Sequence, residues 1–326
     1  MARIDVWRAL ADGIAAGRPV ALVAVVDGRG SSPGKAGDLL AVARSGPLAG
    51  TVGGGVGEAA AIERAMTLLA RGESLRQALP LLLKQTHRTI AGSPSGMICG
   101  GEQRIAIVPL ERSSLPAIEA LLRALGAGRQ ACWAISSRPG GGIELAADGT
   151  ATGWQEDGDG WRYLARSGPD CEAWLIGGGH VSLALSALLV RLDFRVVVCE
   201  ERCGIASFEQ NTHAHERLRC DYAGLGERIR AGRTSFVGIM THDWQGDRCC
   251  LAALAGKELA YLGLLGSRSK IARLTAGLTL PDCFHAPMGL PIGSHTPDEI
   301  AVSIAAEMLL VRSRLAATRA AALRES

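Results

Sequence analysis

The chain has 326 residues, of which 48% are apolar, so it is long enough for two domains with separate hydrophobic cores. Its formal net charge of +3 is too small for the basic stripe that binds nucleic acid, and no apolar run is long enough to cross a membrane. The charged, amphipathic start is unlike a signal peptide, and nine scattered cysteines fit reduced thiols, so we expect a cytoplasmic protein.

The first part of the chain, residues 1–168, predicts an α/β domain. Asp5 can cap a first helix, and the run PVALVAVV at 19–26 is typical of a buried strand. The glycine-rich stretches 28–37 and 46–57 predict loops. Further strands are expected at 38–43, 102–109, 131–136 and 143–147, and further helices at 58–70 and 114–127.

The second part, residues 169–326, predicts a Rossmann-like domain, because short apolar runs alternate with helical patterns. This alternation is typical of a parallel sheet that helices cover on both faces. Thr296, Pro297 and Glu299 predict a capping box at the start of a long last helix. The stretch 153–170, rich in Gly, Asp and Trp, leads up to the domain boundary. Strands are expected at 173–176, 195–199, 236–240 and 260–265, with a helix at 180–192.

A glycine-rich turn joins the first strand and helix of the second domain. In WLIGGGHVS, Gly177 and Gly179 match the first two glycines of a G-x-G-x-x-G dinucleotide-binding turn. Such a turn lets an anion approach the backbone at the helix N-terminus, beside His180. Glu200 ends the next strand, where an acidic residue would bind the ribose of a nucleotide such as NAD(P). A turn that serves only helix–sheet packing is the alternative.

Polar residues also follow two later strands, at the edge where ligands bind in open α/β sheets. His242 and Asp243 could form an oriented acid/base pair, although adjacent side chains often point apart. Ser267 and Arg268 stand between a strand and a helix, where they could hold a phosphate. Loop side chains that bond only to their own backbone are the alternative.

Two glycine-rich loops in the first domain could hold an anion through backbone N–H groups. They are GSSPGKAGDLLAV, at 30–42, and GTVGGGVGE, at 50–58. Lys35 supplies a cation, whereas Glu58 stands at a helix start and would repel an anionic ligand. Tight turns without a ligand are equally compatible with this chemistry.

Cys99 lies in MICGG, directly before Gly100 and Gly101 and a predicted strand. The small neighbours leave its sulfur accessible, and a thiolate is a soft ligand suited to a redox metal or to sulfur transfer. A buried, inert thiol is the alternative. Because the sequence has no C-x-x-C or His-x-x-x-His spacing, we expect no structural zinc site.

Eight motifs in order resemble the xanthine dehydrogenase accessory factor family of the XdhC/CoxI type. The resemblance covers nearly the whole chain, from Gly30 to about Leu309. The motifs are GSSPGKAGDLLAV, GTVGGGVGE, MICGGEQRIAI, WLIGGGHVSLAL, VVVCEER, MTHDWQGD, LGLLGSRSK and APMGLPIGSHTPDEIAVSIAAEML.

This resemblance implies a maturation factor that binds the molybdenum cofactor (molybdopterin). It also implies support of the cofactor's sulfuration and delivery to a xanthine dehydrogenase-type molybdenum hydroxylase. A cysteine desulfurase or sulfurtransferase is the expected second partner, and the pattern allows a homodimer. Cys99 becomes the candidate contact for molybdenum or sulfur, and Gly53, Gly54, Gly55 and Glu58 form the candidate glycine loop. Many relatives carry a cysteine in the second glycine loop, and others carry two adjacent cysteines before the Gly-Gly pair. This chain has neither, so Cys99 is its one candidate thiol.

Two other functions fit the same residues. An NAD(P)-dependent oxidoreductase would use Gly177, Gly179 and Glu200 for its cofactor and His242 as proton donor. A protein without cofactor would instead bring the client enzyme and a sulfurtransferase together. Two fluorescence measurements distinguish the maturation factor from the oxidoreductase. A protein that binds molybdopterin should show pterin fluorescence after purification and oxidation, whereas a dehydrogenase should alter nicotinamide fluorescence.

Overall fold

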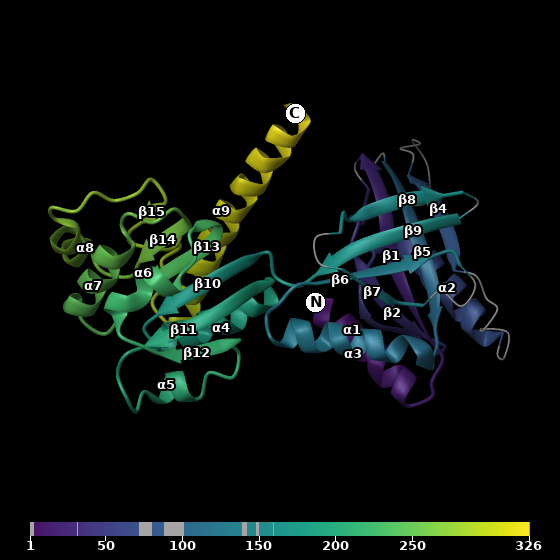
Figure 1. The fold of residues 1–326 in the computed structure, drawn as a ribbon, viewed down its shortest axis with the longest axis horizontal. Coiled ribbons are helices and arrows are strands. Elements are labelled where there is room, and N and C mark those ends of the chain that lie inside the picture. Colours follow the sequence, from purple (N-terminus) through teal and green to yellow (C-terminus); the bar gives the residue numbers. More distant parts are fainter. Residues whose placement is uncertain are drawn as a thin grey trace. The chain divides into compact units, whose positions relative to one another are not determined.

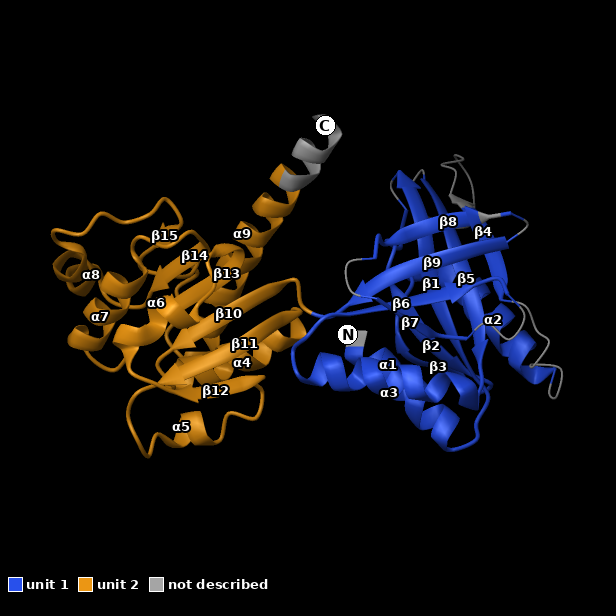
Figure 2. Cartoon of the chain, in the orientation of Figure 1, with its two compact units in different colours: residues 1–168 blue, residues 169–326 orange. Residues whose placement is uncertain are grey.

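A computed structural model divides the chain into two compact units, residues 1–168 and 169–326 (Figure 2). These ranges coincide with the two domains expected from the sequence. In the described part of the chain, no helix is long and apolar enough to cross a membrane. The structure describes residues 3–30, 32–71, 80–87, 101–138, 142–147, 150–158 and 160–325.

The N-terminal unit contains two antiparallel sheets and several helices (Figure 1). The larger sheet has the strand order β3-β2-β1-β5-β4 and the smaller one has the order β7-β6-β9-β8. The strands are β1 (Val20–Gly30), β2 (Leu39–Ala43), β3 (Gly46–Gly50), β4 (Leu81–His87), β5 (Gly101–Leu110), β6 (Ala131–Ser136), β7 (Glu144–Ala146), β8 (Gly153–Asp157) and β9 (Gly160–Ser167). The helices are α1 (Arg3–Ala15), α2 (Gly55–Ala70) and α3 (Leu115–Gly126), which follows the 3₁₀ turn η2 (Arg112–Ser114).

Strand β1 is apolar on both faces because both faces of the larger sheet are covered. Ala21 and Val23 lie in one core with Ala61 and Leu69 of α2. Leu22 and its neighbours on the other face lie in a second core, which α1, α3 and the smaller sheet complete. The run PVALVAVV therefore has the continuous hydrophobicity of a strand buried on both sides.

The C-terminal unit is a six-stranded parallel sheet with the order β12-β11-β10-β13-β14-β15. The chain runs outward from β10 to β12 and then returns to β13, so its switch point lies between β10 and β13. The strands are β10 (Cys171–Ile176), β11 (Phe194–Glu200), β12 (Glu216–Arg219), β13 (Gly232–Ile239), β14 (Leu259–Leu264) and β15 (Phe284–His285). The helical segments are α4 (His180–Arg191), α5 (Ala206–Glu209), η3 (Tyr222–Gly224), α6 (Leu225–Arg228), α7 (Trp244–Leu254), α8 (Arg268–Thr275) and α9 (Pro297–Glu325).

Helices cover both faces of this parallel sheet. Leu189 of α4 and Met308 of α9 belong to the core on one face. Leu254 of α7 and Leu274 of α8 belong to the core on the other face. The fold class expected from the sequence is confirmed, including the Rossmann-like second domain. The capping box is also confirmed, since Thr296 N–H donates to Glu299 and Glu299 N–H donates to Thr296 Oγ1.

The sequence-based expectations missed several strands of the N-terminal unit. β3 lies inside the stretch expected to be a glycine-rich loop, and β4 was not expected. The hairpin β8–β9 occupies the stretch that leads to the domain boundary. β3, β4 and β8 are edge strands, so they pair on one side and show a weaker apolar pattern than central strands.

Candidate functional site

The carboxyl edge of the parallel sheet brings two of the predicted clusters together. Gly177 follows β10, and Thr241 follows β13 on the other side of the switch point. Gly177 has a φ of +105°, and a Cβ there would lie 2.3 Å from the carbonyl oxygen of Met240. The two loops are therefore in direct backbone contact, which only glycine permits at this position.

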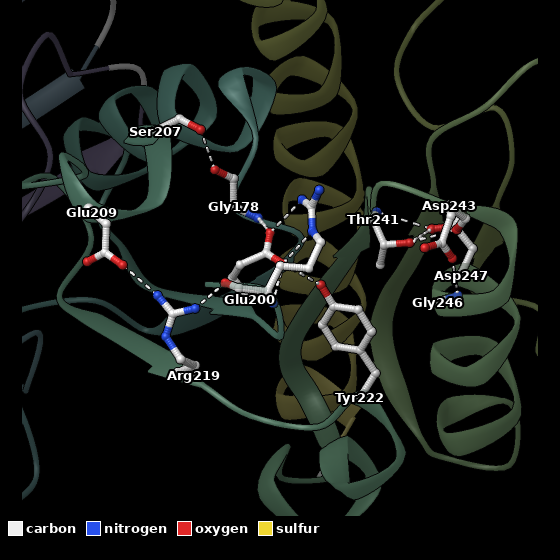
Figure 3. A network of polar contacts seen from close by, with 11 residues as sticks. Gly178, Glu200, Ser207, Glu209, Arg219, Tyr222, Thr241, Asp243, Gly246 and Asp247 are labelled. Carbon is white, nitrogen blue, oxygen red and sulfur yellow. Dashed lines mark hydrogen bonds and ion pairs between the residues drawn. The ribbon is translucent and has the colours of Figure 1, made fainter. Parts of the chain in front are cut away.

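Glu200, the last residue of β11, holds the glycine turn in place (Figure 3). Its side chain is fully buried. The carboxylate accepts hydrogen bonds from Gly178 N–H at 2.8 Å and from Arg202 N–H at 3.0 Å. The Arg202 guanidinium donates to both carboxylate oxygens at 3.0 Å, and the Tyr222 hydroxyl adds a bond of 3.3 Å. The chain itself thus satisfies both oxygens.

These contacts decide the charge state of Glu200. Burial alone would raise its pKa, but the hydrogen bonds from Arg202 and Gly178 outweigh burial and lower the pKa to about 2. The carboxylate is therefore ionised at neutral pH. A ribose hydroxyl pair would have to replace donors that already bind it, so the ribose contact of Glu200 stays a prediction, and the observed role is to anchor the loop.

His242 and Asp243 do not bond to each other as the acid/base pair that the sequence suggested. Asp243 caps α7 by accepting a hydrogen bond from Gly246 N–H at 2.8 Å. His242 is exposed, and in the part of the chain that the structure describes its ring has no hydrogen-bond partner. The geometry gives Asp243 the backbone role that loop carboxylates commonly have.

A carboxylate behind this loop has a larger structural role (Figure 3). Asp247 of α7 is fully buried and accepts hydrogen bonds from Thr241 N–H at 3.1 Å and from Thr241 Oγ1 at 2.6 Å. Its other oxygen lies 2.5 Å from the ammonium group of Lys270 on α8. Asp247 thus fixes the loop that touches Gly177 and links α7 to α8.

The remaining residues predicted at this edge are exposed. Ser267 caps α8 by accepting from Lys270 N–H at 3.3 Å, and Arg268 extends into solvent. His180 begins α4 and is exposed as well. A Cβ at Gly179 would meet nothing within 4 Å, so a ligand can approach the backbone there. Gly179 and His180 are consequently the open part of the turn.

Three motifs of the N-terminal unit meet at one end of the larger sheet: the two glycine loops and the MICGGEQRIAI motif, which contains Gln103. A Cβ at Gly34, in the first glycine loop, would lie 2.4 Å from the carbonyl oxygen of Val52 in the second. Gln103 is 2% exposed and accepts a hydrogen bond from Gly34 N–H at 3.1 Å. Its amide donates to Gln85, which donates in turn to the carbonyl of Gly57. Segments far apart in the sequence are thereby locked together.

Glu58 binds its own loop. One oxygen accepts hydrogen bonds from Val52 N–H at 2.8 Å, Gly54 N–H at 3.1 Å and the Thr51 hydroxyl at 2.5 Å. Burial would raise the pKa of Glu58, but these bonds outweigh burial and lower it. Gly53, Gly54 and Gly55 all have φ between +66° and +117°, which allows the loop to fold around this carboxylate.

Cys99 and Gly100 lie outside the described residues, so the predicted contact with molybdenum stays a prediction. Gly101 is described: it begins β5 and pairs with Gly30 of β1 and His87 of β4. Among the described residues, no three His, Cys, Asp or Glu side chains are grouped as metal ligands. This observation concerns the described side chains alone.

Sequence reasoning overlooked the residues that hold the loops. Arg202, Tyr222, Asp247 and Gln103 all have buried or partly buried polar contacts there. Asp247 could have been found, since it shares the buried face of its helix with Cys250, Leu251 and Leu254. A carboxylate at such a position needs a partner.

Two protein-family models match the sequence. The model described as the XdhC Rossmann domain matches residues 173–308. The model described as the XdhC and CoxI family matches residues 14–79. Together these ranges cover more than half of the chain, one in each compact unit.

Two curated bacterial proteins and one solved structure are among the proteins similar to this chain. A Bacillus subtilis protein named as a probable xanthine dehydrogenase subunit is 29% identical over 154 residues, covering 47% of each chain. The uncharacterized protein YqeB of Escherichia coli is 25% identical over 308 residues, covering 90% of this chain and 44% of its own. The chain thus spans less than half the length of these curated relatives. A crystal structure described as a xanthine dehydrogenase from Bacillus halodurans is similar in fold, with 24% identity, a TM-score of 0.71 and coverage of 96% and 97%.

The two flanking glycines of the turn should respond differently to substitution. Gly177→Ala places a Cβ against Met240 in a left-handed conformation, so the free energy of unfolding should fall by about 2–4 kcal/mol. Gly179→Val enters open space with extended backbone and should leave stability within about 0.5 kcal/mol. It should nevertheless block ligand approach to the turn and abolish NAD binding at this site in calorimetric titration. NAD binding that survives Gly179→Val would show that the turn serves packing alone.

Glu200→Gln should destabilise the protein in a pH-dependent way. The variant leaves Arg202 and Gly178 without a carboxylate, and its free energy of unfolding should be lower by about 3 kcal/mol at pH 7. Because folding lowers the pKa of Glu200 from 4.5 to about 2, its stabilisation is complete above pH 4.5 and is lost as the pH falls toward 2. Urea unfolding should show the difference between wild type and variant shrinking over that window. A constant difference would contradict the charge assignment.

Proposed function

Because the chain belongs to the XdhC and CoxI family, we propose that it is an accessory protein of a xanthine dehydrogenase-type molybdenum hydroxylase. In this proposal it binds the molybdenum cofactor as cargo, supports its sulfuration and delivers it to the client enzyme. The observation that carries the proposal is the convergence of three family motifs at one end of the N-terminal sheet, through Gly34, Val52 and Gln103. Such convergence is expected of a binding site and is not needed for the turns alone.

The groups available for an anionic cofactor differ from those first expected. Glu58 already uses the amides of Val52 and Gly54, so the cofactor phosphate would use other donors. Lys35 is exposed on the first loop, and a Cβ at Gly54 would meet nothing within 4 Å. The phosphate would bind to this ammonium group and to the open backbone at the start of α2.

Cys99 supplies the soft ligand in this proposal. A thiolate can ligate molybdenum or hold a sulfur atom in transit, which the oxygen and nitrogen donors of the loops do poorly. The sulfur would come from a cysteine desulfurase or sulfurtransferase, with which the chain would interact. A homodimer would be compatible with either interaction.

A second candidate function is an NAD(P)-dependent oxidoreductase. The strand order of the C-terminal sheet is that of dinucleotide-binding folds, and Gly177 and Gly179 lie beside its switch point. The engaged carboxylate of Glu200 and the exposed, unpartnered ring of His242 among the described residues favour it less. Titration of the Gly179→Val variant with NAD tests this function directly.

Lys35→Ala should weaken cofactor retention without affecting the fold, because the side chain is exposed and its backbone N–H makes the local bond to Asp38. We expect pterin content per chain to fall about tenfold, as one charged contact to a phosphate is lost. The measurement is pterin fluorescence after oxidation of the purified protein. Lys84→Ala, which removes another exposed lysine on the edge strand β4 of the same sheet, is the matched control and should retain wild-type content. Equal losses in both variants would show a general charge effect.

Cys99→Ser should fold normally and lose most of its molybdenum, or lose the ability to activate the client enzyme. Serine keeps the size and polarity of cysteine but removes the soft ligand. Molybdenum content and client activation would be measured beside the melting temperature. Cys203→Ser is the control, because Cys203 is an exposed thiol of the other unit. If Cys99→Ser matches wild type in both measurements, the thiol has no role and the glycine loops act without it.

A further inference from the structure

A groove between α7 and α8 has no part in the functions considered so far. Its volume is about 660 Å³, within the range of small-molecule sites. Both helices belong to the sheet face opposite α4 and α9, so the groove is separate from the open glycine turn at α4. The lining includes Trp244 and Arg248 of α7 and Ser269, Lys270, Arg273 and Leu274 of α8.

The groove keeps an uncompensated positive charge. The Arg248 guanidinium donates to the carbonyl oxygens of Leu274 and Ala276, which fix it without neutralising it. The ammonium of Lys270 is balanced by the buried carboxylate of Asp247. Arg273 has neither an ion pair nor a hydrogen bond within the described ranges. Two guanidinium groups are thus available to an anion, and guanidinium geometry suits phosphate oxygens.

An exposed aromatic side chain completes the site. Trp244 begins α7 and is 61% exposed, which makes it the most exposed of the large apolar side chains that the structure describes. An indole in this position leaves a large apolar surface in water unless a ligand covers it. Flat heteroaromatic rings stack on such surfaces, as nucleic-acid bases do.

We propose that the α7–α8 groove binds a nucleotide, with its phosphate on Arg248 and Arg273 and its base against Trp244. An indole ring and a pair of guanidinium groups along one groove match a ligand that carries both a base and a phosphate. This inference does not depend on the molybdenum cofactor proposal, since that cofactor is assigned to the N-terminal unit.

The ligand chemistry is tested with adenosine monophosphate on the full chain. Calorimetric titration should show binding of adenosine monophosphate, with adenosine and inorganic phosphate each binding at least about tenfold more weakly, because each offers half of the contacts. Binding should also quench tryptophan emission. Adenosine and the monophosphate binding equally would overturn the role of the two arginines.

The site is located with four variants, each checked by its melting temperature. Arg273→Ala should weaken binding at least about tenfold, and Trp244→Leu should weaken it and remove the emission change. Arg233→Ala removes an exposed arginine at the start of β13, at the opposite edge of the sheet, and should bind as wild type. Gly179→Val is the fourth variant, because it tests the glycine turn as the alternative place of binding.

Three results would overturn the proposal. If adenosine monophosphate does not bind at millimolar concentration, the groove is not a nucleotide site. Equal weakening in Arg233→Ala and Arg273→Ala would reduce the effect to net charge. Binding lost in Gly179→Val but kept in Arg273→Ala would place the nucleotide at the glycine turn instead.

Discussion

Carboxylates of the chain itself hold its glycine-rich loops, and the geometry of both units depends on this interaction. Glu58 accepts the N–H groups of Val52 and Gly54, and Glu200 accepts that of Gly178. Glu307 of α9 does the same for Gly289. Glycine loops expose amides that have no partner in a helix or sheet, and a buried amide without a partner costs free energy. An internal carboxylate supplies that partner, so the loops keep their shape without a ligand.

The same interaction limits where an anionic ligand can bind. A loop whose amides are free is a ready anion site, but amides already bonded to a carboxylate are not. At the carboxyl edge of the parallel sheet, Glu200 accepts the Gly178 amide of the turn after β10. Asp247 likewise accepts the Thr241 amide of the loop after β13. Open backbone and unpaired cations therefore decide the candidate sites, rather than glycine content.

Local sequence patterns predicted much of the fold. Most of the site could not be predicted in this way, because it depends on contacts between residues far apart in the sequence. The alternation after residue 169 and the capping box at Thr296 predicted the C-terminal unit because each depends on neighbours in sequence. The bond between Gly34 and Gln103 joins residues 69 positions apart, and that between Gly178 and Glu200 joins residues 22 apart. The dinucleotide-binding fingerprint associates an acidic residue with the glycine turn, but no spacing rule predicts that Glu200 binds the turn's own amide or that Gln103 binds Gly34. Glu58 was recognised as unfavourable to an anion, but its use as the loop's own anion required the folded backbone.

Glycines within one motif are of two kinds, those in close contact with a neighbouring backbone and those facing open space. The sequence alone does not distinguish them. Gly177 is required by contact, since a Cβ would lie 2.3 Å from a backbone oxygen, while Gly179 two residues later faces open space. The second loop of the N-terminal unit repeats the pattern: a Cβ at Gly53 would lie 2.5 Å from Gly34 N, and one at Gly54 would meet nothing within 4 Å. The first kind places the loop against its neighbour, and the second leaves the backbone accessible. A turn built only for packing needs the first kind, so the open glycines are the positions where these motifs can serve a ligand.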